Sequence, residues 1–137
     1  MERFDVEIIL DKGIQSEEEL SDDELLIYSV AYFESIADME GWDHFYTYEM
    51  RLYPALQIML RLAGDICSLN VLKAYENHFI ELGVKFTSTE IDGFLSTATN
   101  EYLASCPDWR EEFSKLGQMR WNLISSYFKA EGIEIKT

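Results

Sequence analysis

Basic residues are scarce in this 137-residue sequence, which has 11 Lys and Arg against 26 Asp and Glu and a net charge of −15. Proteins bind nucleic acids largely through Lys and Arg side chains that displace counterions from the phosphates. Anionic membrane surfaces attract basic segments in the same way. We therefore expect no direct binding of DNA, RNA or a membrane surface.

Cysteine is also scarce, and long apolar runs are missing. Cys67 and Cys106 are too few for a disulfide framework, so we expect both to be reduced and buried. No stretch approaches the roughly 18 apolar residues that indicate a membrane-spanning helix. The first residues, from Met1 to Asp5, lack the basic and then apolar pattern of a signal peptide. These absences predict a cytoplasmic protein.

The motifs that usually mark catalytic or metal sites are missing as well. His44 and His78 lack the Glu-x-x-His spacing of di-metal bundles, because Gly41 and Tyr75 occupy the required positions. The sequence contains no paired Cys-x-x-Cys, His-Glu-x-x-His, Gly-rich phosphate loop or Gly-x-Ser-x-Gly elbow. His78 lies at the edge of an apolar stripe, where we expect a hydrogen-bonded boundary histidine. The sequence thus predicts a protein that is not an enzyme and has no metal and no cofactor.

Apolar residues are plentiful, at 47% of the chain, and capping signals divide them into helices. Ser21 and Glu24 form a capping box before an apolar helix that ends at Gly41. We predict an all-α fold, a compact single-domain bundle of five or six helices over 1–137. Its further segments are a short helix or aromatic connection at 42–50, a central helix from Pro54, a helix from Ser68 to Gly83, a helix that starts with a capping box at 87–90 and ends at 106–107, and a last helix at 108–130.

The two ends of the chain have a different pattern. Residues 4–8 and 133–135 alternate between apolar and charged side chains, which is typical of strands. Two interpretations remain open: the ends pair as a short β ribbon, or residues 4–10 form another helix. Residues 1–20 are expected to be a loosely packed extension.

Negative charge is concentrated in the first third of the chain. Residues 1–50 have 15 acidic and two basic residues, a net charge of −13, whereas residues 51–137 have 11 acidic and nine basic residues, a net charge of −2. One interpretation of the run at 17–24 is a solvated helix start. At about 100° per residue, Asp23, Glu34 and Asp38 share one face of the helix that follows. The predicted partner-binding residues are Glu17, Glu18, Glu19, Asp22, Asp23, Glu34, Asp38, Glu40 and Asp43.

Arg120 interrupts an apolar helical face. It lies between positions such as Phe113 and Tyr127 when the last segment is read as one helix. An arginine there either extends its charged end to solvent at the end of the bundle or pairs with a carboxylate of another helix. We expect a structural role for it.

Segment 42–53 is unusually rich in aromatic residues. Aromatic side chains are enriched both in protein cores and in binding hot spots. We expect a mixed arrangement in which Trp42 and Phe45 are buried and one or two tyrosines are exposed.

Residues 20–82 resemble the bacterial DNA-mimic domain family. The resemblance rests on residues 20–24, an amphipathic helix, residues 40–46, Ala63-Gly64 and a further amphipathic helix. The usual central pattern of the family is Asn-Gly-Gly-Phe-x-Gln-Tyr-Phe. In this sequence Glu40-Gly41 stands at the glycine pair, and Trp42 stands at the phenylalanine. His44 stands at the glutamine, and Phe45-Tyr46 stands at the Tyr-Phe pair. Met39 stands at the asparagine position, and Tyr48 replaces the asparagine usual after the aromatic residues.

This resemblance implies an all-helical acidic protein, often a homodimer, whose carboxylates imitate the phosphates of DNA. Such a protein occupies the DNA-binding face of a basic DNA-binding protein such as a transcription factor. An alternative is an immunity protein that neutralises a cationic toxin, for example a nuclease. A third class is an enzyme or a small-molecule-binding protein with a buried polar pocket near His44 and Tyr46.

Overall fold

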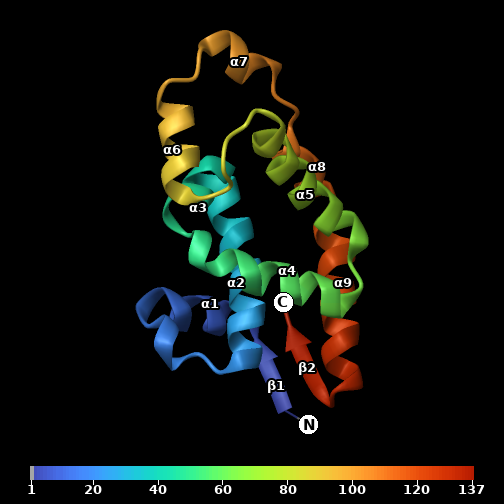
Figure 1. The fold of residues 1–137 in the computed structure, drawn as a ribbon. Coiled ribbons are helices and arrows are strands. Elements are labelled where there is room, and N and C mark those ends of the chain that lie inside the picture. The colour runs from blue at the N-terminus through green and yellow to red at the C-terminus, as the bar shows by residue number, and fades with distance from the viewer. Residues whose placement is uncertain (1) are drawn as a thin grey trace.

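The computed structural model describes residues 2–137, which are mostly helical (Figure 1). These residues form nine α-helices rather than the predicted five or six, together with two short 3₁₀ helices and two strands. The elements are β1 (Glu2–Asp5), α1 (Val6–Gln15), η1 (Glu17–Glu19), α2 (Asp22–Met39), α3 (Trp42–Tyr48), η2 (Met50–Leu52), α4 (Tyr53–Ala63), α5 (Ile66–Glu81), α6 (Ser88–Ser96), α7 (Asn100–Ser105), α8 (Trp109–Lys115), α9 (Gly117–Ala130) and β2 (Ile133–Lys136).

Helix α2 has both of the predicted end signals and lies at the centre of the fold. The Ser21 hydroxyl accepts a hydrogen bond from the Glu24 N–H, and the Glu24 carboxylate accepts one from the Ser21 N–H, which confirms the capping box. At the other end, the N–H groups of Glu40 and Gly41 both donate to the Ile36 carbonyl. Gly41 has a φ of 91°, a conformation that favours glycine, so the chain turns sharply into α3.

The core is continuous and aromatic. The ring of Phe33 on α2 has its centroid 4.7 Å from Phe45 and 5.1 Å from both Trp42 and Phe113. Helix α4 crosses the middle of the molecule, between α2 and α9 (Figure 1). It buries Leu56 and Leu60 but leaves Ile58 and Leu62 exposed on its other side. One hydrophobic cluster thus joins residues from Ile9 to Ile133.

The chain ends form both of the structures that the sequence left open. Strands β1 and β2 pair in parallel, with Glu2 opposite Ile133 and Asp5 opposite Lys136. Helix α1 follows directly, and its Ile9 is buried in the core. Residues 2–20 are therefore part of the packed domain and not a loose extension, whereas Met1 lies outside the described residues.

Several predicted helix boundaries are wrong, and for α5 and α7 the reason is that another residue in the region caps the helix. The Asp65 carboxylate accepts from the Ser68 N–H at 3.0 Å, so Asp65 caps α5 and the helix begins earlier than predicted. Thr99 caps α7 and divides the helix expected to extend to 106–107. The predicted last helix breaks between α8 and α9, next to Gly117, a residue that weakens helices. Because Cys67 lies in the first turn of α5 on its outer side, it is exposed, contrary to expectation.

Candidate functional site

The acidic residues of the first third divide into ion-paired and unpaired groups. Of the 15 acidic residues in 1–50, five form salt bridges, which leaves ten without one in the described part of the chain. The five pairs are Asp5 with Lys136, Glu17 with Arg51, Glu24 with Lys12, Glu34 with Arg120 and Glu49 with Arg51. Two predicted partner-binding residues, Glu17 and Glu34, are therefore paired inside the fold. A third, Asp43, accepts a hydrogen bond from the Tyr75 hydroxyl.

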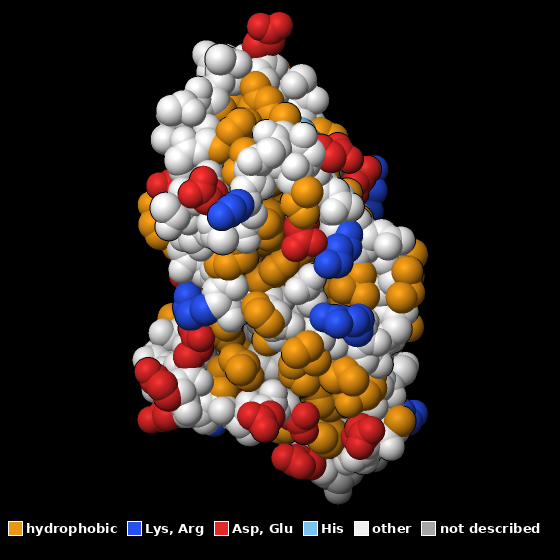
Figure 2. Space-filling model, viewed as in Figure 1, with side chains coloured by type: hydrophobic (Ala, Val, Ile, Leu, Met, Phe, Trp, Pro, Cys, Tyr) orange, Lys and Arg blue, Asp and Glu red, His pale blue; other side chains and the backbone are white. Residues whose placement is uncertain are grey.

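Four carboxylates without salt bridges lie close together in the sequence, around the start of α2. Glu18, Glu19, Asp22 and Asp23 are all exposed, and we call them the N-terminal acidic cluster. A hydrogen bond from the Ser16 hydroxyl lowers the pKa of Glu18, which keeps that carboxylate charged. Figure 2 shows acidic side chains gathered at the lower end of the molecule, where β1, α1 and the start of α2 lie. The acidic side chains there lie beside an area of hydrophobic side chains in this view.

Glu34 does not belong to an exposed acidic face. Its Oε2 accepts hydrogen bonds from Nε of Arg120 at 2.9 Å and from a terminal nitrogen of the same guanidinium at 2.5 Å. Its Oε1 accepts from the indole nitrogen of Trp121 at 2.7 Å. The prediction of one acidic face through Asp23, Glu34 and Asp38 is therefore wrong, because the middle of this face of α2 packs against α9.

Arg120 is buried and fully engaged. Beyond Glu34, its guanidinium donates to the Ser68 hydroxyl at 3.1 Å and to the Phe113 carbonyl at 3.0 Å. The guanidinium carbon lies 3.8 Å from the centre of the Phe113 ring. Of the two interpretations of this residue, the pair with another helix is confirmed, and its role is structural.

The aromatic segment after Gly41 faces mostly inwards. Trp42, Phe45 and Tyr46 are buried, whereas Tyr48 is 66% exposed and its ring lies 4.8 Å from that of His44. Burial and then the neighbouring Tyr53 and Tyr75 rings raise the pKa of Tyr46, so it remains neutral. The predicted mixed arrangement is confirmed, with one exposed tyrosine in α3.

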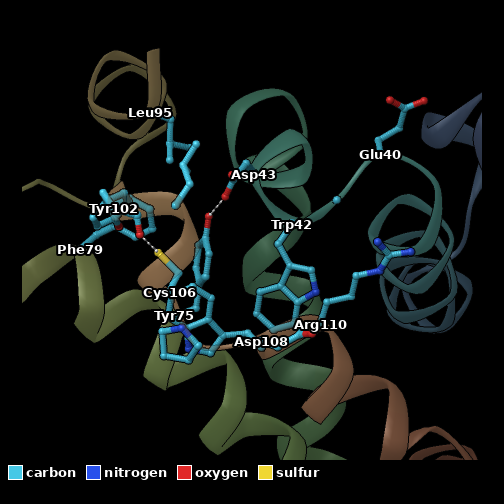
Figure 3. A pocket seen from close by; sticks show the side chains of 14 residues that line it. Glu40, Trp42, Asp43, Tyr75, Phe79, Leu95, Tyr102, Cys106, Asp108 and Arg110 are labelled. Atoms are coloured by element: carbon cyan, nitrogen blue, oxygen red, sulfur yellow. Dashed lines mark hydrogen bonds between the residues drawn. The ribbon is translucent and has the colours of Figure 1, made fainter. Parts of the chain in front are cut away.

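A second group of unpaired carboxylates surrounds a cleft at the junction of α2 and α3. The cleft has a volume of about 230 Å³ and lies between α3, α5, α7 and α8 (Figure 3). Glu40, Asp43 and Asp108 are the acidic residues along its lining, and Arg110 is the one basic residue among them. The Glu40 carboxylate points away from the cleft (Figure 3), and Oδ1 of Asp108 accepts a hydrogen bond from the Glu111 N–H at 3.0 Å. Its aromatic lining comes from Trp42, Tyr75, Phe79, Tyr102 and Trp109. We call this feature the acidic cleft.

Hydrogen bonds fix the walls of the acidic cleft. The Tyr75 hydroxyl donates to Oδ1 of Asp43 at 2.7 Å, and burial followed by the Asp43 charge raises the pKa of Tyr75. On the opposite wall, Nε2 of His78 lies 2.6 Å from the Tyr102 hydroxyl, and the Cys106 thiol donates to the Tyr102 carbonyl. His78 is therefore the hydrogen-bonded boundary histidine that the sequence predicts.

The structure places the pocket differently from the sequence-based alternative. Tyr46 is fully buried and the His44 ring lies against that of Tyr48. Neither residue lines the acidic cleft, which lies instead beside Trp42 and Asp43. The sequence does not indicate that Asp108 and Trp109 lie at the same site as Asp43, because they are more than sixty positions from it. The aromatic run after Gly41 was the only local signal for this region.

Within residues 2–137, no group of three His, Cys, Asp or Glu side chains is arranged to hold a metal ion. None of the helices described here has the length and apolar character needed to cross a bilayer. The sequence matches no protein-family model and no curated protein, and the fold matches no solved structure.

Proposed function

We propose that this chain is an acidic binding protein that occupies the DNA-binding surface of a basic partner protein, with carboxylates in the places of DNA phosphates. The observation that carries the proposal is the set of ten acidic residues in 1–50 that have no salt bridge among the described residues. Unpaired exposed charges of one sign attract an oppositely charged partner and increase the association rate. The resemblance to DNA-mimic proteins supports the same function.

The N-terminal acidic cluster is the part of the surface best suited to this contact. Its four carboxylates occur within six residues, and duplex DNA likewise carries dense charge, one for roughly every 1.7 Å of its axis. Glu18 and Asp22 have exposed side chains, so a partner reaches them without any change in the fold. Glu34 is left out of the proposed contact surface because it pairs with Arg120.

A titration of the partner tests the proposal. The partner is first captured on the immobilised protein from an extract of the native host at low salt, identified and purified. It is then titrated with labelled duplex DNA and increasing amounts of this protein at two salt concentrations. We expect displacement of the DNA, and weaker binding of this protein at high salt, because salt screens exposed charges beyond about 8–10 Å.

Charge reversal locates the contact. We expect Glu18→Lys with Asp22→Lys to weaken binding strongly. The matched control, Glu111→Lys in α8 with Glu131→Lys directly after α9, should have little effect. Equal losses for both pairs would argue against the N-terminal acidic cluster. A partner that holds DNA and this protein together would overturn DNA mimicry. If the partner is a toxic nuclease, the immunity-protein interpretation replaces that of a transcription regulator.

A further inference from the structure

We propose that the free edge of β2 is an interface between two copies of this chain, in which β2 pairs with its counterpart in antiparallel orientation. The inference goes beyond the proposed function, because β2 lies at the opposite end of the sequence from the N-terminal acidic cluster. Strands β1 and β2 form a two-stranded sheet, so within residues 2–137 neither strand has a partner on its outer edge. Such an edge presents backbone N–H and C=O groups with which another strand can pair.

A groove runs along the free edge of β2, between this strand and α9. Its volume is about 400 Å³, and it is lined by Ser125 and Lys129 of α9 and by Ile133, Glu134 and Ile135 of β2. Neighbouring residues of a strand point to opposite faces, so a groove lined by three consecutive residues lies at the edge of the strand. The groove therefore offers a further strand both the backbone of β2 and an apolar surface.

Hydrophobic side chains are also exposed around this part of the molecule. Figure 2 shows them beside the acidic side chains at the lower end, where β2 and α9 lie in Figure 1. Exposed apolar areas with a polar rim mark interaction sites. Pairing of β2 with a second β2 would join two ribbons into one four-stranded sheet, within the range of about four to six strands usual for sheets.

The local charge favours a second copy over the basic partner. Residues 125–137 contain two basic residues, Lys129 and Lys136, and two acidic residues, Glu131 and Glu134, so their net charge is zero. The whole chain has a net charge of −15, and a large net charge keeps copies of a protein apart. Two copies therefore meet with little repulsion at this edge, whereas a basic partner gains no attraction from it.

The sequence of β2 complements itself in antiparallel pairing. With Ile135 opposite Ile135 of the second copy, Glu134 of each copy lies opposite Lys136 of the other, and opposite charges stabilise such cross-strand pairs. A register centred on Glu134 would instead place two glutamates opposite each other, which is unfavourable. Lys136 already pairs with Asp5 at 3.3 Å, and its ammonium group has further donors for Glu134 of the second copy. The same patch is thus used twice, as in most homodimers.

Sedimentation equilibrium of the full chain, from low micromolar to near millimolar concentration, tests the dimer. The contact is short, and small interfaces are typical of weak complexes, so we expect a reversible dimer at the higher concentrations. Glu134→Lys and Lys136→Glu each place like charges opposite each other in both pairs. We expect each variant to dimerise about tenfold more weakly than the wild type. The matched controls, Glu131→Lys before β2 and Lys115→Glu in α8, should dimerise like the wild type.

An equimolar mixture of the two β2 variants tests the register. Glu134→Lys has lysine at both positions and Lys136→Glu has glutamate at both, so the mixed dimer regains opposite charges in both pairs. We expect native mass spectrometry to show the mixed dimer in clear excess over the dimers of either variant alone. A mixture of the two control variants should show no such preference.

Three results would overturn the inference. The first is a wild-type chain that stays monomeric throughout, and the second is a dimer that Glu134→Lys and Lys136→Glu do not weaken. The third is a mixture without preference for the mixed dimer. If the wild type stays monomeric and the N–H resonances of residues 133–136 shift only when the basic partner is added, the groove belongs to that partner. None of these measurements involves DNA, so the dimer and the proposed function stand or fall separately.

Discussion

Arg120 is the largest of the fully buried side chains, and its position depends on partners from three parts of the chain. Glu34 lies on α2, Ser68 on α5 and the Phe113 carbonyl on α8. Removing one member of a buried pair is strongly destabilising, because the other charge remains without compensation. At the residue scale, this cluster ties the central helix to the C-terminal half of the domain.

We predict that Arg120→Ala lowers the free energy of unfolding by roughly 3 kcal/mol, measured by urea denaturation. The loss combines an unpaired Glu34 with two unsatisfied acceptors and a cavity beside Phe113. Lys115→Ala removes an exposed pair with Glu111 and should cost about 0.5 kcal/mol or less. Similar values for the two variants would show that the buried cluster contributes no more than a surface pair.

Glu24 provides a prediction for the dependence of stability on pH. The Ser21 N–H and then Lys12 hold the pKa of this carboxylate below its ordinary value of 4.5. A pKa that is lower in the folded state adds stability above the unfolded value, and this stability is lost as the pH falls through the folded value. Glu24→Gln keeps an acceptor for Ser21 but loses the charge. We expect a deficit of about 0.5 kcal/mol at pH 7 that shrinks below about pH 4.5.

Urea denaturation of both proteins between pH 3 and pH 7 measures this difference. Glu131→Gln, which changes an exposed residue without a salt bridge among those described, is the control and should show a smaller deficit at pH 7. A deficit for Glu24→Gln that stays constant across the range would assign the effect to side-chain packing.

At the element scale, α1 and α2 pack closely at a position that excludes a side chain. A Cβ atom added to Gly13 of α1 would lie 2.3 Å from Cε1 of Tyr28 on α2. The Tyr28 ring is itself buried and stacked on Tyr32, with the ring centroids 5.1 Å apart. The ring therefore has little freedom to move away, and Gly13 permits the contact between these helices.

We predict that Gly13→Ala destabilises the domain by about 1–3 kcal/mol, although alanine is the better helix former. Gly93 of α6 is the matched control, since an added Cβ there meets nothing within 4 Å. Gly93→Ala should raise stability by up to about 1 kcal/mol through helix propensity. Thermal unfolding of the two variants measures both effects, and shifts of the same sign would contradict the proposed contact.

Local signals predicted some elements well. The capping box at Ser21 and the glycine at Gly41 set the bounds of α2, since both act within a few residues of the helix end. The sequence does not predict the division at Leu116, because apolar periodicity continues from Phe113 into α9 across the break. The predicted start of α5 differs from the observed one, because Asp65 and Ser68 are both good caps and periodicity alone does not choose between them.

The candidate site was predictable only in part, because it depends on distant contacts. The exposed charges of Glu18 and Asp22 follow from composition alone. The pairing of Glu34 with Arg120 joins residues 86 positions apart, and helical periodicity contains no signal for it. The acidic cleft joins Asp43 to Tyr75 and Asp108 through the packing of three helices, which the local pattern around Gly41 does not specify.

At the scale of the whole molecule, the net charge of −15 is unevenly distributed and only partly compensated. Self-repulsion among carboxylates destabilises a compact state, and salt screens this repulsion. Exposed ion pairs such as Lys115 with Glu111 weaken in salt but contribute little. We therefore predict that raising sodium chloride from about 20 to 500 mM increases the melting temperature. A decrease, measured by circular dichroism, would show that ion pairs outweigh the repulsion.

The parallel pairing of the two strands affects how the protein folds during synthesis. Glu2 of β1 lies opposite Ile133 of β2, so the partners are separated by almost the whole chain. On the ribosome, β1 emerges before β2, and the ribbon cannot form until both strands have been synthesised. In the nascent chain, Phe4 lacks the Phe128 ring that packs against it in the finished fold, with the ring centroids 6.1 Å apart. Pairing of the two strands therefore waits until residues 133–136 have left the ribosome.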